Sequence, residues 1–213
     1  MGAILISEYS QFVRALVVGL ALVVGAVSLV GSAVGAERFK RHAVRGQGVS
    51  LEVPASWIAV DASLPSATIT QLGRENPKLA PFISQLGGPN SPAKFLALDA
   101  SLRGGFATNV NVAVVPVPSI TFAQYRTALA SEIRSIVGSA PIDARSVTIA
   151  GARAVRLSYK LQIRFGRTVV VQTLQYGFLR PGRSVVVTYT TLPGLKSQFA
   201  QTFARSAASI RFS

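Results

Sequence analysis

The feature that most constrains the fold of this chain is a run of ten residues in which apolar and polar side chains alternate without exception. Residues 155–164 read VRLSYKLQIR, with all apolar side chains in one phase and all polar side chains in the other. Because successive side chains of a β-strand point to opposite faces, this pattern predicts a strand with one buried face and one face in water. A parallel sheet covered by helices on both sides leaves no such wet face, so the pattern favours an antiparallel sheet.

The segments around this strand predict the other elements of one α+β domain. The expected strands are 49–53, 94–99, 108–117, 168–179 and 184–191, and the expected helices are 79–86, 122–137 and one around 195–203. The helix 122–137 has the clearest signals, because Thr121 and Gln124 match a capping box and an apolar stripe runs from Phe122 to Ile136. Trp57, the one tryptophan, is interpreted as a core residue.

Positive charge is concentrated in the last third of the chain. The sequence has 22 Lys and Arg against 8 Asp and Glu, a formal net charge of +14. Residues 144–213 hold 11 basic side chains and no acidic one, and arginine outnumbers lysine 17 to 5 over the whole chain. Guanidinium groups bind phosphate and carboxylate groups through paired hydrogen bonds. The charge is interpreted either as an anion-binding surface or as an arginine-rich composition that only keeps a wet sheet face soluble.

The N-terminal segment predicts export or membrane attachment. Residues 15–36 contain no charged side chain and, as a helix, are long enough to cross a hydrocarbon core of about 30 Å. They end in small residues, which suit a signal-peptidase site after Ala36. We therefore expect one hydrophobic N-terminal helix in 1–36 (a cleaved signal peptide or an anchor), a basic tether over 37–47, and a folded domain over 48–213. The domain is expected outside the cytoplasm, associated with the cell envelope.

The basic residues that follow the apolar run leave a second orientation open. They are Arg38, Lys40, Arg41 and Arg45. Since positive charge tends to stay on the cytoplasmic side of a membrane helix, they favour an anchored protein whose C-terminal domain is cytoplasmic.

The residue types that common catalytic and metal sites need are scarce. The chain has no cysteine, which excludes disulfides, thiolate zinc sites and lipid-modified cysteines. Its one histidine, His42, falls in the expected tether, and the glycine-rich phosphate loop and the Gly-x-Ser-x-Gly nucleophile motif are absent from the sequence. The carboxylates of the expected domain are spread over separate elements: Glu52, Asp61, Glu75, Asp99, Glu132 and Asp143. We expect no enzyme activity, no metal and no cofactor, and an acid–base pair formed by two of these carboxylates is the alternative.

Several segments resemble the PsbP-like fold family, which has bacterial relatives of the LpqN and DcrB types. They are VSLEVPASW, NVNVAVV, VTIAGARAVRLSYK and SVVVTYTTLPGLKSQFAQTFARSAASIRF, and the resemblance spans 46–213. The resemblance implies a mostly antiparallel central sheet with packed helices, and a non-catalytic accessory or envelope protein. Neither the lipid anchor of some relatives nor the metal binding of photosystem members is carried over, because the cysteine is missing and His42 lies outside the expected domain.

Six basic residues are candidates for anion binding: Arg156, Lys160, Arg164, Arg167, Arg180 and Arg183. The first three share one strand face at steps of about 13 Å, and the others flank two hairpin turns. This spread suits an extended polyanion or an anionic membrane surface better than a small ligand. Asn109 and Asn111 share one face of their expected strand, where solvation is expected and ligand contact is the alternative.

These observations predict a non-catalytic extracytoplasmic binding or accessory module of the bacterial envelope. Its expected partner is an unknown protein or an anionic lipid or polymer, and the domain is expected to be monomeric. One alternative is a binding protein or enzyme for a small anionic substrate. The other is a cytoplasm-facing nucleic-acid-binding protein, which is disfavoured because Tyr159 lies in the apolar phase, opposite the basic residues that base stacking would accompany.

Overall fold

The computed structural model describes residues 37–86, 92–165 and 167–213 of the 213-residue chain. The expected N-terminal helix in 1–36 lies outside the described residues. Within the part that is described, no helix combines the length and the apolar composition that crossing a membrane requires.

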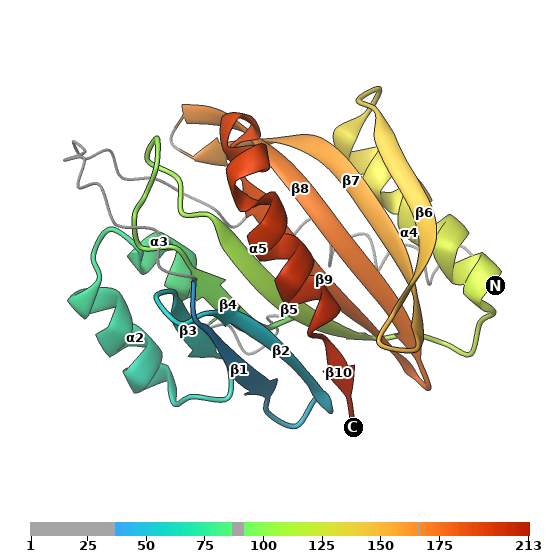
Figure 1. The fold of residues 1–213 in the computed structure, drawn as a ribbon, viewed down its shortest axis with the longest axis horizontal. Helices are drawn as coiled ribbons and strands as arrows, with labels where there is room; N and C mark the ends of the chain where they lie inside the picture. Colours follow the sequence, from blue (N-terminus) through green and yellow to red (C-terminus); the bar gives the residue numbers. More distant parts are fainter. Residues whose placement is uncertain (1–36, 87–91, 166) are drawn as a thin grey trace.

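Two antiparallel sheets form the framework (Figure 1). The larger sheet has seven strands in the order β3-β4-β5-β9-β8-β7-β6, and the smaller one has the order β1-β2-β10. The larger sheet consists of β3 Ile58–Asp61, β4 Ala93–Leu98, β5 Asn109–Pro116, β6 Ile142–Ile149, β7 Ala152–Phe165, β8 Arg167–Arg180 and β9 Arg183–Thr191. The smaller sheet consists of β1 Phe39–Val44, β2 Val49–Pro54 and β10 Arg211–Phe212. The expected α+β class with a mostly antiparallel sheet is confirmed.

The helices cover the two faces of the larger sheet unequally (Figure 1). They are α2 Ser66–Glu75, α3 Ala80–Ile83, η1 Ser84–Leu86, α4 Phe122–Val137, η2 Pro193–Leu195 and α5 Lys196–Ala208. We call the side of the sheet that packs against α4, α2 and α3 the α4 face, and the side that packs against α5 and the smaller sheet the α5 face.

The α4 face buries a cluster in which Leu129 and Ile133 of α4 meet Leu157 of β7 and Phe106. The helix begins where the sequence predicts, since the Thr121 hydroxyl accepts from the backbone N–H of Gln124, whose side chain accepts from the backbone N–H of Thr121. Each cap bond satisfies a backbone donor that the first helical turn leaves free.

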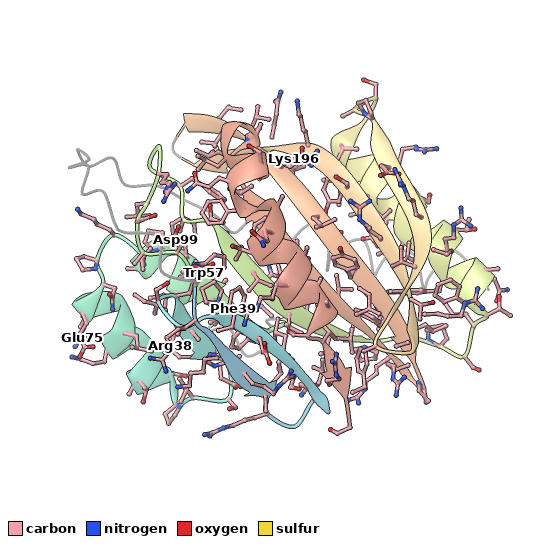
Figure 2. All side chains as sticks on the ribbon, in the orientation of Figure 1. Arg38, Phe39, Trp57, Glu75, Asp99 and Lys196 are labelled. Atoms are coloured by element: carbon pink, nitrogen blue, oxygen red, sulfur yellow. The ribbon has the colours of Figure 1, made fainter. Side chains whose placement is uncertain are left out.

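On the α5 face, aromatic rings join α5 to both sheets. Phe203 lies 5.0 Å from the ring of Tyr189 in β9, and Phe199 lies 6.2 Å from the ring of Trp57. Trp57 lies beside the smaller sheet (Figure 2) and is buried, as expected for a core residue. Phe212 of β10 joins the smaller sheet to the larger one directly, since its ring lies 5.0 Å from that of Phe178 in β8.

The segment expected to be a basic tether, 37–47, is instead part of the fold. It contains β1, which pairs along its whole length with β2. His42 therefore lies within the folded domain, half-buried, with its ring 5.5 Å from that of Phe95 in the larger sheet. Burial and the nearby Lys40 ammonium lower the pKa of His42. The sequence patterns also missed α2 and β6, which lie at opposite edges of the molecule (Figure 1).

Candidate functional site

The basic residues predicted on β7 lie on a part of the α5 face that α5 does not cover. The helix crosses the sheet over the β9 side, and β6 and β7 extend beyond it (Figure 1). The described residues of this uncovered area include Arg145 on β6, Arg156 and Lys160 on β7, and Val170 on β8, whose side chain is 41% exposed. The predicted alternation is confirmed, because Leu157, Tyr159 and Leu161 are buried while Lys160 and Gln162 are exposed.

Arg156 is held by an acidic neighbour that the β6–β7 register brings beside it. Its guanidinium donates to Asp143 Oδ2 over 3.1 Å, and Arg145 donates to Asp143 Oδ1 over 2.7 Å. The hydrogen bond from Arg145 and, after it, that from Arg156 lower the pKa of the exposed Asp143 carboxyl. Two guanidinium groups share one carboxylate here, so the group keeps a net positive charge.

Lys160 lies one step further along β7 and has no ion pair or hydrogen bond with the described residues. Its exposed ammonium group is therefore available to an anion. Lys160 pairs in register with Gln172, whose side chain donates to the Ser158 hydroxyl on the same face.

Arg180 and Arg183 lie at the other end of the sheet, paired across the β8–β9 turn. The Arg180 guanidinium carbon is 4.8 Å from the ring centroid of Phe212, and Arg183 lies beside Gly48. Gly182 follows Pro181 in this turn and adopts φ +69°, as the third residue of a type II turn requires. The side chains of Arg164 and Arg167 lie outside the described part of the structure.

The described candidates therefore form a spread row rather than a convergent pocket. Counted along paired β7 and β8, Arg180, Arg156 and Lys160 are separated by steps of about 13 Å. Such spacing does not let several of these groups contact one small anion together. Tyr159 is buried on the opposite face, so it is not placed to stack a base beside this row.

A second polar group, which no sequence pattern marks as a site, lies on the α4 face. Gln175 of β8 pairs with Thr188 of β9, which pairs with Asn111 of β5, so three polar side chains lie in one row across adjacent strands. Glu132 of α4, which is only 8% exposed, lies near Tyr159 of β7, the strand next to the β8 end of this row. Its neighbour Tyr159 donates its hydroxyl to Gln175 Oε1 over 2.9 Å. We call Glu132, Gln175, Thr188 and Asn111 the α4-face polar row.

Burial sets the protonation of Glu132. Removal from water raises its pKa to about 8, well above the ordinary value of 4.5, because the charged form loses solvation. The titratable side chains that face α4 from the described parts of β6, β7 and β8 are Tyr159 and Arg153. Burial and the nearby Glu132 raise the pKa of Tyr159, and Arg153 lies over the Phe122 ring at the start of the helix, 4.3 Å from its centroid. Glu132 is therefore neutral near pH 7.

The signal for this row was present in the sequence as a helical spacing. Glu132 follows Leu129 by three residues and Tyr125 by seven, which places it on the buried side of α4. Asn111 was expected to be solvated, yet its Oδ1 is buried. In the described ranges, no three His, Cys, Asp or Glu side chains gather in a way that could hold a metal ion.

Comparisons with known proteins identify the fold. No family model matches the sequence, and a search of curated proteins finds no match. Among solved structures, cyanobacterial PsbP (CyanoP) from Synechocystis sp. PCC 6803 is 16% identical with a TM-score of 0.50, over 89% of this chain and 100% of its own. LpqN of Mycobacterium tuberculosis, described as involved in cell envelope biogenesis, is 12% identical with a TM-score of 0.54, over 83% of this chain and 92% of its own. At these identities the likeness concerns the fold, and the fold of this chain is PsbP-like.

Proposed function

We propose that this chain is a non-catalytic module of the cell envelope, located outside the cytoplasm, that docks on an anionic surface through the uncovered part of its α5 face. The observation that carries the proposal is the row of basic groups on β6–β8, in a region of the chain that has no acidic residue after Asp143. The apolar segment 15–36 supports an exported location, and so does the envelope role of LpqN, which shares the fold.

The layout of the charges favours a lipid surface. A sheet face with cations at intervals of about 13 Å can contact many separate headgroups at once, and each Lys or Arg near an anionic membrane contributes about 1 kcal/mol. Exposed Val170 lies in the same area, where it can contact the interfacial region. Convergent groups, which a small anionic substrate needs, are not found among the described candidates.

Co-sedimentation of residues 37–213 with vesicles tests the proposal, once circular dichroism has shown that this fragment folds. We expect binding to vesicles of phosphatidylglycerol and phosphatidylcholine, no binding to pure phosphatidylcholine, and loss of binding when salt is raised well above 0.1 M, where the screening length is about 10 Å.

Matched charge reversals locate the surface. Lys160→Glu is expected to weaken binding at least about fivefold, since it removes one attraction of about 1 kcal/mol and adds a repulsion. Arg126→Glu makes the same charge change on the exposed side of α4, on the other side of the sheet, and is expected to have little effect. Binding that ignores salt, or equal losses in the two variants, would refute docking through the α5 face.

A further inference from the structure

The end strands of the two described sheets differ in length, and β6 is the longest of them. β3 and β6 end the larger sheet, and β1 and β10 end the smaller one. β6 has eight residues, against six in β1, four in β3 and two in β10. Proteins usually keep edge strands short or interrupt them with bulges, proline or lysine, because an open edge pairs with other chains. β6 lies at the rim of the molecule (Figure 1), pairs with β7 in unbroken register and contains neither proline nor lysine.

The hairpin turn after β6 determines which of its backbone groups face outward. Ile149 pairs with Ala152 across Ala150 and Gly151, whose φ angles are both positive, +48° and +79°, as in a type I′ turn. The pair that closes such a turn is hydrogen-bonded, and hydrogen-bonded pairs alternate along two antiparallel strands. The backbone groups that face away from β7 therefore belong to the even-numbered residues: Ile142, Ala144, Ser146 and Thr148. No hydrogen bond to these outward groups is found among the described residues.

Apolar surface on both faces of the sheet continues to this edge. None of the eight residues of β6 is fully buried. Val147 and Ile149 are half-buried against the cluster of the α5 face, and Ile142 and Ala144 are half-buried against that of the α4 face. One further strand would cover apolar surface on both sides and would pair the outward backbone groups. The edge therefore fits an extended segment of polypeptide.

The charges beside the edge favour an acidic segment. Arg145 lies on the α5 side of β6 with a side chain that is 67% exposed, and its register partner on β7 is Arg156. Both share the carboxylate of Asp143, so the group remains cationic. In an added strand, the residue opposite Arg145 would lie about 5 Å from it, close enough for an ion pair. A second copy of this chain would instead bring its own Arg145 and a net charge of +14 to the edge.

We propose that the outer edge of β6 binds an extended acidic segment of another protein, which adds a strand to the larger sheet. The segment runs antiparallel to β6, as the paired strands of this sheet do. On the α5 side its residues are apolar opposite Val147 and Ile149 and acidic opposite Arg145. The backbone of β6 holds the segment, and docking on an anionic surface does not use that backbone, so this inference goes beyond the proposed function.

Fluorescence anisotropy with the full-length chain in lauryldimethylamine oxide micelles tests the edge. The probe is the labelled peptide Thr-Val-Thr-Val-Thr-Glu-Thr with blocked ends, which places its valines opposite Ile149 and Val147 and its glutamate opposite Arg145. We expect a dissociation constant of about 0.1 mM or lower, with micelles alone as the baseline. Lysine in place of the peptide's glutamate is expected to weaken binding at least about fivefold, because an attraction to Arg145 becomes a repulsion.

Two N-methylated forms of the peptide test the strand geometry. In the bound peptide the N–H groups of the threonines face β6, whereas those of the valines face away from it. Methylation of the two central threonine nitrogens removes two hydrogen bonds and is expected to weaken binding at least about tenfold. Methylation of the two valine nitrogens is expected to leave binding within about twofold of that of the unmodified peptide.

Substitutions at Ser146 test whether the peptide binds at β6. Ser146→Pro removes an outward N–H, a change that an edge strand tolerates, and is expected to weaken peptide binding at least about tenfold. Ser146→Val changes the same side chain but keeps the N–H, so it is the matched control and is expected to bind like the parent chain. Ser146→Pro is also expected to dock on anionic vesicles like the parent chain, which separates the two proposals. If Ser146→Pro does not fold, the methylated peptides carry the test.

Three results would overturn the proposal. The first is no binding of the glutamate peptide at protein concentrations up to about 1 mM. The second is equal binding of the two methylated peptides, which would mean that the backbone of the peptide does not pair with the edge. The third is a dimer of the parent chain in analytical ultracentrifugation that Ser146→Pro converts to a monomer, which would identify a second copy as the occupant.

Discussion

At the scale of single residues, contacts between described arginines and aromatic rings explain part of the arginine excess. Four of them lie over aromatic rings, the closest being Arg205, whose guanidinium carbon is 4.0 Å from the centroid of Phe39 on β1. The others are Arg103 over Phe199, Arg153 over Phe122 and Arg180 over Phe212. A planar guanidinium stacks on a ring in a way that a lysine ammonium does not, so these arginines pack the fold together and remain cationic. Lys160, by contrast, has no such structural contact among the described residues.

The buried carboxyl of Glu132 predicts how stability depends on pH. Its pKa in the folded chain is raised to about 8 from 4.5, so the native state holds the proton more tightly than the unfolded chain. The contribution is therefore fully present below pH 4.5 and decreases as pH rises toward 8, by up to about 1.4 kcal/mol per pH unit. Glu132→Gln is expected to remove this decrease, so the variant unfolds at higher denaturant concentration than the parent at pH 8 and at a similar one at pH 4.5.

Urea unfolding at several pH values between 4 and 9 measures this difference. Glu75→Gln, an exposed carboxylate on α2, is the control and is expected to leave the pH dependence unchanged. Parallel pH profiles for the parent chain and Glu132→Gln would show that the Glu132 carboxyl is ionised in the folded protein at neutral pH.

At the scale of elements, the seating of α4 depends on a glycine in β8. A Cβ added at Gly177 would lie 2.5 Å from the Tyr125 hydroxyl and 2.6 Å from Leu129 Cδ2, closer than real side chains approach. Gly177→Ala is therefore expected to push α4 from the sheet and to lower the free energy of unfolding by about 1–3 kcal/mol. The measurement is urea unfolding, and Gly194→Ala, where an added Cβ meets nothing within 4 Å, is the control. Equal stability of the two variants would contradict this account of the packing.

A second element-scale prediction concerns β1, the strand formed by the segment that was expected to be a tether. Arg41 joins β1 to β2 through Glu52 at 2.9 Å and Ser50 at 3.1 Å, and it donates to the backbone oxygen of Ser209 at the end of α5 over 3.1 Å. The group is partly exposed, so Arg41→Ala is expected to lower the free energy of unfolding by only about 0.5–1 kcal/mol. Lys40→Ala, at the adjacent exposed position, should change it by less, and thermal unfolding of the two variants compares them.

Local signals in the sequence predicted some of the elements, and tertiary pairing determines the others. The helix α4 carries its cap and its stripe in its own residues, and β7 carries ten alternating positions, so both were predictable. Edge strand β6 and basic strand β1 lack a clear apolar phase, because their stability comes from backbone pairing with β7 and β2. Helix α2 buries only Ile69, so its apolar pattern was weak.

The same distinction applies to the two candidate sites. The alternation in 155–164 was sufficient to predict the basic row on one face of β7. The Arg156–Asp143 ion pair was not predictable, because it depends on the register between β6 and β7. The α4-face polar row combines residues from α4, β5, β8 and β9, which only the strand order β5-β9-β8 brings together.

At the scale of the whole molecule, the two hydrophobic clusters share one sheet, which predicts that they unfold together. Strands β4 and β8 send side chains into both clusters, since Leu96 and Val171 lie in the cluster of the α4 face and Phe95 and Phe178 lie in that of the α5 face. Neither cluster can therefore be lost while the other keeps its strands. Fluorescence of Trp57 reports on the α5 face, and far-ultraviolet circular dichroism reports on all the helices and strands. The two signals are expected to change at the same denaturant concentration.

Phe212→Ala provides the sharpest form of this test, because the substitution lies in the last, two-residue strand of the fold. Phe212 packs on Phe178 and under Arg180, and β10 pairs with β2, so this short strand is tied into the α5-face cluster. Loss of this half-buried ring is expected to cost about 2 kcal/mol, or roughly 4–8 °C in the unfolding midpoint for a domain of this size. If the molecule is one cooperative unit, the fluorescence and dichroism midpoints fall by the same amount, since the contact stabilises every strand at once.

Val170→Ala, on the uncovered part of β8, is the control and is expected to change the free energy of unfolding by less than about 0.5 kcal/mol. A shift confined to the Trp57 signal would instead mean that the α5-face cluster and the smaller sheet open separately while the α4 face remains folded.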